Sequence, residues 1–308
     1  MLSRVAERLY WLGRYVERAE NTSRLVSVVN NVTLDMPGAA GELWPSVLEL
    51  LGSSAAFRQR HAAINEKNVL RWLIADESQP GSLVSSLQAA RENARTVREV
   101  LPSEAWELLN ALYWSAHETA EASTGRKHRE AWLDNVVMKS HQFAGLIRGT
   151  MSHREPYQFL LLGATLERAD MTSRIIDVGA SLARRGAEFA ADEGLLWMNI
   201  LLCLSAYQMY RQQIRERVTG AEVVEFLMRD PGFPHAVRWC LDHLEQALGS
   251  LPNNQAPLRA NRRMVKLLAG AELGSLLQGG LHEFIDALQI ELAALHADIA
   301  RAWFGHAA

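Results

Sequence analysis

The side chains of this sequence that could do chemistry gather in one segment that occurs twice. Residues 13–26 read GRYVERAENTSRLV and residues 163–176 read GATLERADMTSRII, so seven of fourteen positions are identical at an offset of 150. Each copy holds a Glu-Arg pair, a second acid three residues after the glutamate and an arginine four residues after that acid. Carboxylates and guanidinium groups at helical spacing can pair with one another, bind an anion or transfer protons.

On a helix, Glu17, Glu20 and Arg24 fall within a narrow sector together with Gly13, and Glu167, Asp170 and Arg174 do the same with Gly163. A glycine inside a helix costs about 1 kcal/mol relative to alanine. Its presence at the same place in both copies therefore predicts the close approach of another backbone. The candidate binding or docking residues are Arg14, Glu17, Arg18, Glu20, Arg24, Glu167, Arg168, Asp170 and Arg174.

Arg168 is the most informative of these residues, because Leu161 and Ile175 are its neighbours around the helix. Its guanidinium must leave an apolar surface, and since arginine keeps its charge, burial requires a carboxylate partner or a bound anion. Three interpretations stay open. In the first, the charges form a network that fixes how two copies dock. In the second, they line a shared polar pocket on a pseudo-twofold axis that binds a carboxylate, phosphate or amide ligand. In the third, they form an active site in which Glu17 or Glu167 acts as general acid or base.

A second internal match follows the first in the same order. Residues 69–87 and 223–241 share a valine, two leucines, an aspartate and a proline at an offset of 154. Two collinear matches at nearly equal offsets indicate duplication and fusion. The sequence therefore predicts an all-α, multi-helix bundle: one domain over residues 1–308, made of two tandem repeated helical units, about 1–150 and 151–308, related by a pseudo-twofold axis.

Helical periodicity dominates the chain, and no segment has the period-two pattern of a strand. Leu2, Val5, Leu9, Leu12 and Val16 form one apolar stripe of a first helix that runs to about residue 34 and is broken by Met36-Pro37-Gly38. In the first half, further helices are predicted from Pro80-Gly81 to about 100, from 103 after a Leu101-Pro102-Ser103 cap, and around 136–151 after a charged loop at 125–129. In the second half, helices are predicted over 156–184, from an Asp192 cap to about 217, from Thr219, from Pro234, and over 280–303 after a loop at 251–254.

Composition limits the class of protein. Hydrophobic residues make up 48% and charged residues 22% of the 308 positions, which is typical of a globular chain. The net charge of −3 gives no electrostatic signature of a nucleic-acid or membrane partner. Cys203 and Cys240 lie in apolar runs and are expected to be buried free thiols, which fits the cytoplasm. No signal peptide or membrane anchor is expected at the start, and the apolar stretch 195–207 is too short to span a bilayer.

No sequence motif assigns a cofactor, a metal or a catalytic residue. Glu-x-x-His pairs, Cys-x-x-Cys, Gly-x-Ser-x-Gly and glycine-rich phosphate loops are missing from the sequence, so we predict neither cofactor nor metal and regard an enzyme as the less favoured alternative. The acids and histidine of residues 117–121 are expected to form an exposed face and not a metal site. Arg91, Asn93, Arg95 and Arg98 form either a solvated face or a surface for a partner or an anion.

Several stretches together resemble one known family, the bacterial alpha-E proteins. They are YWLGRYVERAENTSRL, AARENARTVREVLPSEAWELLN, FLLLGATLERADMTSRIID and FPHAVRWCL, in the same order over essentially the full length. The chain departs from that family at Ala164, where the family pattern has an arginine after the second glycine.

The resemblance implies a functional setting. Genes of alpha-E proteins accompany a circularly permuted ATP-grasp ligase and a transglutaminase-like peptidase, so these two enzymes are the implied partners, with a peptide-like or amino-acid substrate. The ligase would supply ATP and Mg²⁺ chemistry and the peptidase a nucleophilic cysteine. We therefore expect a non-catalytic substrate-binding or scaffolding component of an amide-ligase system. The alternatives are an enzyme that uses paired glutamates in amide-bond chemistry and a purely structural helical protein.

Overall fold

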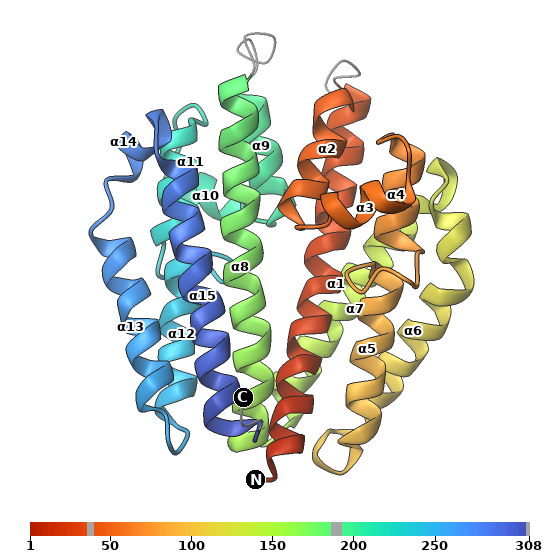
Figure 1. Ribbon diagram of the computed structural model, residues 1–308, viewed down its shortest axis with the longest axis vertical. Coiled ribbons are helices and arrows are strands. Elements are labelled where there is room, and N and C mark those ends of the chain that lie inside the picture. Colours follow the sequence, from red (N-terminus) through yellow and green to blue (C-terminus); the bar gives the residue numbers. More distant parts are fainter. Residues whose placement is uncertain (36–39, 186–192, 306–308) are drawn as a thin grey trace. The chain divides into compact units, whose positions relative to one another are not determined.

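The computed structural model describes residues 1–35, 40–185 and 193–305. Within these ranges every regular element is helical and no strand occurs, as the sequence predicts. The chain divides into two compact units, Met1–Ala164 and Thr165–Ala308. The boundary falls inside helix α8 (Glu155–Arg185), so this helix contributes residues to both units. Figure 1 identifies each helix by its label and by its colour along the chain.

Helices of the first unit before α8 are α1 (Ser3–Asp35), α2 (Ala40–Leu50), α3 (Ser54–Arg60), α4 (Glu66–Ile74), α5 (Leu83–Thr96), the short 3₁₀ helix η2 (Arg98–Val100), α6 (Ser103–Ser123) and α7 (Arg126–Thr150). The long helix α1 packs against α5 and α7, and α6 packs against the same two helices, so these four form a bundle. The short helices α2 and α3 pack against each other, and α4 contacts α2, α5 and α6.

The apolar stripe of α1 accounts for its position in the bundle. Leu9 and Leu12 are fully buried and Val16 is nearly so, whereas Leu2 precedes the helix and is exposed. The predicted start and end of the first helix agree with α1. The predicted break at residues 36–38 lies outside the described residues.

The second unit contains the rest of α8 and helices α9 (Glu193–Cys203), α10 (Tyr207–Gln213), α11 (Gly220–Arg229), α12 (Val237–Gly249), α13 (Gln255–Ala269), α14 (Leu273–Gln278) and α15 (Leu281–Trp303). Helix α13 packs against α12 and α15, and α11 packs against α9, α12 and α14. Helix α8 contacts α9, where Gly179 lies against the side chains of Trp197 and Ile200.

The sequence predictions for residues 126–129 and for the helix expected to end at about residue 217 are wrong. Residues 126–129 are not a loop but the first turn of α7, and this charged turn is stable because the Arg129 guanidinium donates a hydrogen bond of 2.8 Å to the carbonyl of Thr124. The predicted helix to about residue 217 ends at Cys203, because Ser205 adopts a left-handed φ of 51° that interrupts the helical hydrogen bonds. Its predicted Asp192 cap lies outside the described residues.

The cysteines and the most apolar helix behave as core. Cys203 and Cys240 are buried free thiols, as predicted. In α9, Leu196, Trp197 and Leu201 are all buried within the second unit. None of the helices that the structure describes has the length and apolar character needed to cross a lipid bilayer.

Candidate functional site

Two glutamates of the repeated segment are buried on one face of α1. The unbroken helix places Glu17 and Glu20 one turn apart, and each is only 4% exposed. The Glu17 carboxylate accepts a hydrogen bond of 3.0 Å from the side-chain amide of Asn21. The same amide also donates to the backbone carbonyl of Glu17 at 3.0 Å, so Asn21 holds this carboxylate against its own helix.

Glu20 links α1 to α7. Its Oε1 accepts from Nε of Arg24 at 3.1 Å and lies 2.8 Å from Nε2 of His141, which belongs to α7. The same His141 nitrogen is 2.8 Å from a terminal nitrogen of Arg24. A carboxylate, a guanidinium and an imidazole thus meet at the contact between the two helices. These contacts link α1 to α7.

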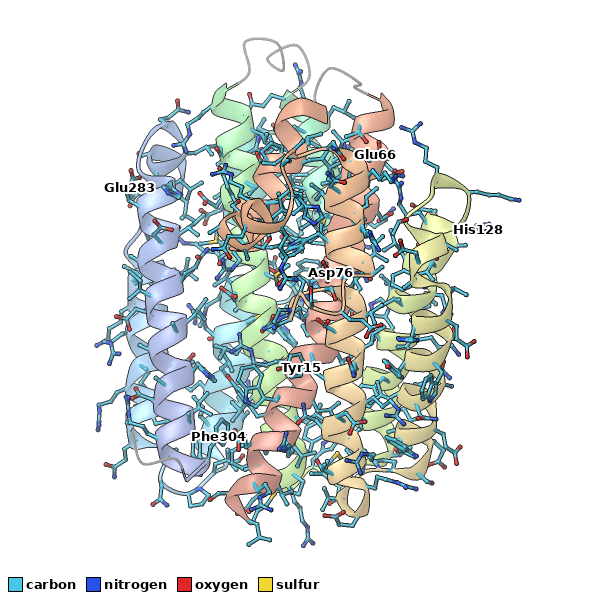
Figure 2. All side chains as sticks on the ribbon, turned by 45° about the vertical axis from the view of Figure 1, so that its right-hand side comes forward. Tyr15, Glu66, Asp76, His128, Glu283 and Phe304 are labelled. Carbon is cyan, nitrogen blue, oxygen red and sulfur yellow. The ribbon has the colours of Figure 1, made fainter. Side chains whose placement is uncertain are left out.

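The remaining arginines of this segment lie over aromatic rings. The guanidinium carbon of Arg14 is 5.3 Å from the ring centroid of Trp11, and that of Arg18 is 5.5 Å from the ring centroid of Tyr15. Both arginines are half-buried. Figure 2 shows Tyr15 about midway along α1. The rings stabilise the cations through their negatively polarised faces.

The second copy of the segment has a comparable arrangement within its own unit. Glu167 is 2% exposed, and Asp170 pairs with Nε of Arg174 at 3.0 Å. The Arg168 guanidinium lies over the ring of Trp239 on α12 at 5.9 Å, and it makes further interactions. The burial predicted for Arg168 is thus partial, and an aromatic ring supplies one of its contacts.

One further pair joins α8 to α15. Nδ1 of His282 lies 2.9 Å from Oδ2 of Asp177, and Nε2 lies 3.5 Å from Oδ2 of Asp286. The hydrogen bond and the negative charge of Asp177 raise the pKa of His282, with a smaller contribution from Asp286. The imidazole is therefore held in its protonated form over a wider pH range than usual.

The two repeated glycines mark a close approach of backbones within the first unit, as the sequence predicts. A Cβ added to Gly13 would collide with the carbonyl oxygen of Leu160 and lie 2.9 Å from the backbone nitrogen of Ala164. A Cβ added to Gly163 would collide with the carbonyl oxygen of Tyr10 and lie 2.8 Å from its carbonyl carbon. The two clashes involve backbone atoms of α1 and of the first turns of α8, so neither position tolerates a side chain.

A single family description covers almost the whole chain. Residues 1–304 match the Alpha-E family, which is described as a predicted alpha-helical domain with a conserved ER motif. The chain belongs to the Alpha-E family. The Glu-Arg pairs at 17–18 and 167–168 are of the kind that this description names, and the structure places both glutamates in the interior.

Relatives of this Alpha-E chain are uncharacterized mycobacterial proteins. One from Mycobacterium bovis and one from Mycobacterium tuberculosis strain CDC 1551 are each 24% identical over 96% of this chain, and one from strain H37Rv is 23% identical. The chain spans about a third of their length, since the match covers 35% of each relative. No solved structure matches it.

A buried arginine of this Alpha-E chain, outside the repeated segment, was not predicted from the sequence. Arg129 is 2% exposed and donates to Glu66 of α4 at 3.1 Å and to the side chain of Asn30. Partial burial raises the pKa of Glu66, but hydrogen bonds from Arg126 and Arg129 outweigh this effect and the pKa is lowered. Figure 2 shows Glu66 and His128 at the same end of the unit.

A signal for Arg129 existed in the sequence. This residue continues the buried stripe of α7, which includes Leu133 and Val136 at spacings of four and three.

His141 and Trp239 were missed for a different reason. They contact the Glu-Arg helices from elements far away in the chain, and nothing in their own segments identifies that contact.

The aspartate of the second internal match has a structural role in this Alpha-E chain. After α4, Oδ1 of Asp76 accepts from the backbone N–H of Ser78 at 2.9 Å. After α11, Oδ1 of Asp230 accepts from the backbone N–H groups of Gly232 at 2.8 Å and Phe233 at 2.7 Å. Both aspartates therefore stabilise the turn that leads into the next helix. Among the described residues, no group of three or more His, Cys, Asp or Glu is placed to hold a metal ion.

Proposed function

We propose that this Alpha-E chain is a non-catalytic substrate-binding or scaffolding component of a bacterial, cytoplasmic system that forms amide or peptide bonds. A circularly permuted ATP-grasp ligase is the partner that forms these bonds, and a transglutaminase-like peptidase is the second partner. Membership of the Alpha-E family supports the setting. The greater length of the mycobacterial relatives supports it too, because a fused partner domain would account for the part that has no counterpart here.

One observation carries the proposal that the Glu-Arg segments have a binding or docking role. Their carboxylates accept hydrogen bonds from side chains that are part of the fold: Glu17 from Asn21, and Glu20 from Arg24 with His141 alongside. Such carboxylates fix helix positions and keep neighbouring arginines in place. We assign to both Glu-Arg segments the binding or docking role, with the half-buried arginines as the groups that engage an anionic or amide ligand.

We also propose that the two halves are copies of one helical unit related by a pseudo-twofold axis. The reciprocal glycine contacts support this relation, because Gly13 meets residue 160 while Gly163 meets residue 10, each pair shifted by 150. The burial of positions 11–30 agrees with that of positions 161–180 except at three pairs, 15/165, 20/170 and 30/180. Asn65 and Thr219, which are 154 positions apart, both cap the next helix.

Reconstitution with the ligase tests the proposed function. Amide-bond formation and ATP consumption by the purified ligase are measured with and without this protein, and with the variant Arg168→Ala. We expect the protein to raise the yield of product and Arg168→Ala to remove most of this effect. Arg238→Ala is the matched control, because Arg238 also lies in the second unit but pairs with Asp242 within α12.

Two outcomes contradict the proposal. The first is a ligase reaction that proceeds unchanged whether or not the protein is present. The second is turnover of an amide substrate by the isolated chain that Glu167→Gln abolishes while the circular dichroism spectrum is retained, because this would make the protein an enzyme.

A further inference from the structure

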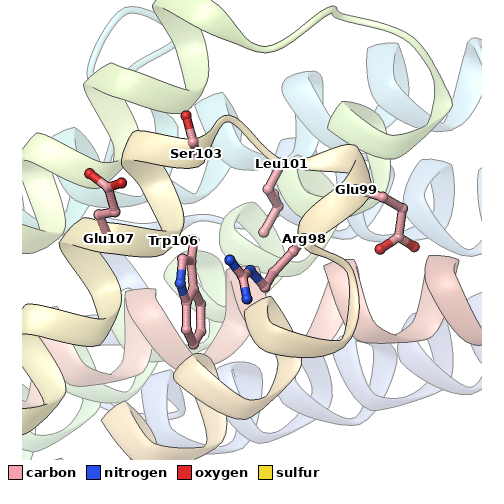
Figure 3. Close-up of a pocket in the computed structure, with 6 residues that line it drawn as sticks. All are labelled: Arg98, Glu99, Leu101, Ser103, Trp106 and Glu107. Carbon is pink, nitrogen blue, oxygen red and sulfur yellow. The ribbon is translucent and has the colours of Figure 1, made fainter.

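A cavity of about 450 Å³ lies in the first unit where η2 meets the start of α6. It is lined by Arg98, Glu99, Leu101, Ser103, Trp106 and Glu107. Figure 3 shows the Arg98 guanidinium beside the Trp106 ring, with the carboxylates of Glu99 and Glu107 on opposite sides of this pair. The volume lies within the range of about 300–1,000 Å³ that is typical of small-molecule sites.

Trp106 is flanked by two arginines that differ in their partners. The guanidinium carbons of Arg98 and Arg91 lie 5.0 Å and 5.6 Å from the ring centroid. Arg91 is satisfied, because it donates to Glu92 at 2.6 Å and to Asn110 at 2.8 Å. The Arg98 guanidinium makes the ring contact but no hydrogen bond or ion pair with any residue that the structure describes. The ring therefore holds the Arg98 cation in place while its N–H groups are available to a ligand.

The acids at the cavity are also unpaired. Neither the Glu99 carboxylate nor the Glu107 carboxylate forms a hydrogen bond or ion pair within the described parts of the chain. Nearby acids differ: Glu92 pairs with Arg95 at 2.8 Å, and Glu104 accepts from Ser103 at 3.0 Å. All three charged residues that line the cavity are exposed and make no side-chain hydrogen bond or ion pair with a described residue, whereas Arg91, Glu92 and Arg95 nearby are paired.

We propose that this cavity binds a zwitterionic amino acid or short peptide. The ligand carboxylate pairs with Arg98, the ligand ammonium group pairs with Glu99 or Glu107, and the aliphatic part lies against Leu101 and the Trp106 ring. A planar guanidinium held at its face by a ring is well suited to a two-pronged bond with a carboxylate.

The charge of the lining selects this class over inorganic anions. One guanidinium faces two carboxylates, so a phosphate dianion meets net repulsion, while a zwitterion offers a charge of each sign. The inference goes beyond the proposed function, since it places a ligand site outside the Glu-Arg helices. The test of this site uses the isolated chain without the ligase. An unchanged ligase rate would therefore contradict the proposed function but not this inference.

Calorimetric titration of the full chain with L-alanyl-L-alanine tests the site. The wild-type protein is expected to bind the dipeptide, and Arg98→Ala to weaken the affinity about tenfold or more, as loss of a charge-assisted pair does. Arg95→Ala is the matched control, because Arg95 is also exposed and lies three residues earlier, in the last turn of α5, but pairs with Glu92. The affinity of this variant for the dipeptide should change less than twofold.

Ligand analogues test the same contacts without altering the protein. The dipeptide with a C-terminal amide should bind the wild-type protein as weakly as the unmodified dipeptide binds Arg98→Ala. The N-acetyl dipeptide should bind equally to wild type, Glu99→Gln and Glu107→Gln. Inorganic phosphate should not displace the dipeptide. Equal binding by wild type and Arg98→Ala, absence of dipeptide binding, or displacement by phosphate would each overturn the proposal.

Discussion

Burial determines how much individual charged side chains contribute to the stability of this protein. The Glu20 and Arg24 side chains are 5% and 10% exposed, whereas the Glu225 and Arg229 side chains are 52% and 29% exposed at the same i,i+4 spacing. Exposed pairs contribute about 0–1 kcal/mol because water and salt screen them. A buried charge that loses its partner keeps the cost of desolvation, so it is far more sensitive to substitution.

Glu20→Gln is therefore expected to lower the free energy of unfolding by about 1–3 kcal/mol, because Arg24 loses a charged acceptor in a buried place. Urea denaturation followed by circular dichroism measures the change. Glu225→Gln is the control and should cost less than about 1 kcal/mol. Equal losses for the two variants would mean that the charge of Glu20 has no special role in the docking of α1.

His282 should make stability depend on pH. Its pKa is raised in the folded protein by Asp177, so the stabilisation from this pair is fully present below the ordinary histidine pKa of about 6.5 and is lost as the pH rises through the raised value. The melting temperature of wild type minus that of His282→Asn should thus be largest near pH 5.5 and shrink at alkaline pH. A difference that grows with pH would have the wrong sign for this pair.

At the scale of elements, the contact of α1 with the start of α8 depends on two glycines. The backbones approach so closely that a methyl group at either position meets a carbonyl group of the opposing helix. Backbone atoms cannot rotate away as a side chain can, so the helices would have to separate.

Gly13→Ala is accordingly expected to destabilise the protein by roughly 2–4 kcal/mol despite the higher helix propensity of alanine. Gly145→Ala in α7 is the matched control, because nothing lies within 4 Å of a Cβ at this position. The control should be neutral or stabilising by up to about 1 kcal/mol. Thermal melts compare the two variants, and a stabilising Gly13→Ala would contradict the close approach.

The boundaries of elements show which local signals were sufficient. Long periodic stripes predicted α1, α8 and α15 closely, and a Thr219 side chain caps α11 as expected. The cap predicted at Ser103 is wrong, because the hydroxyl of that residue bonds to the Glu104 carboxylate and not to a backbone N–H. Helices α2, α3, α4 and α14 were missed, since short helices owe their stability to packing more than to their own pattern. Helix α13 was also missed, although it has 15 residues.

At the scale of the whole molecule, α8 belongs to both compact units. Residues up to Ala164 pack in the first unit and residues from Thr165 in the second. A continuous helix resists division, because each turn depends on hydrogen bonds to the next. Loss of either unit would therefore remove the packing of part of the same helix.

The chain is thus expected to unfold in one cooperative transition. Differential scanning calorimetry should give one peak, with equal calorimetric and van't Hoff enthalpies. Gly163→Ala should shift this peak to lower temperature as a whole, because it disturbs the start of the shared helix. Two separate peaks, in the wild type or in this variant, would show that the units unfold independently.

The sequence by itself determined the properties that a helix carries within its own segment. These are the all-helical class, the repetition of the Glu-Arg segment, and the need for glycine at positions 13 and 163. Each follows from residue spacing, since side chains three and four apart share a face.

Only the tertiary structure decided which side chains meet across helices. His141 reaches Glu20, Trp239 lies under Arg168, and Arg98 is held over Trp106 beside a cavity. The pairing of residues from distant segments depends on the register and the angle at which two helices dock. That geometry results from the packing of many side chains at once, so no local pattern encodes it.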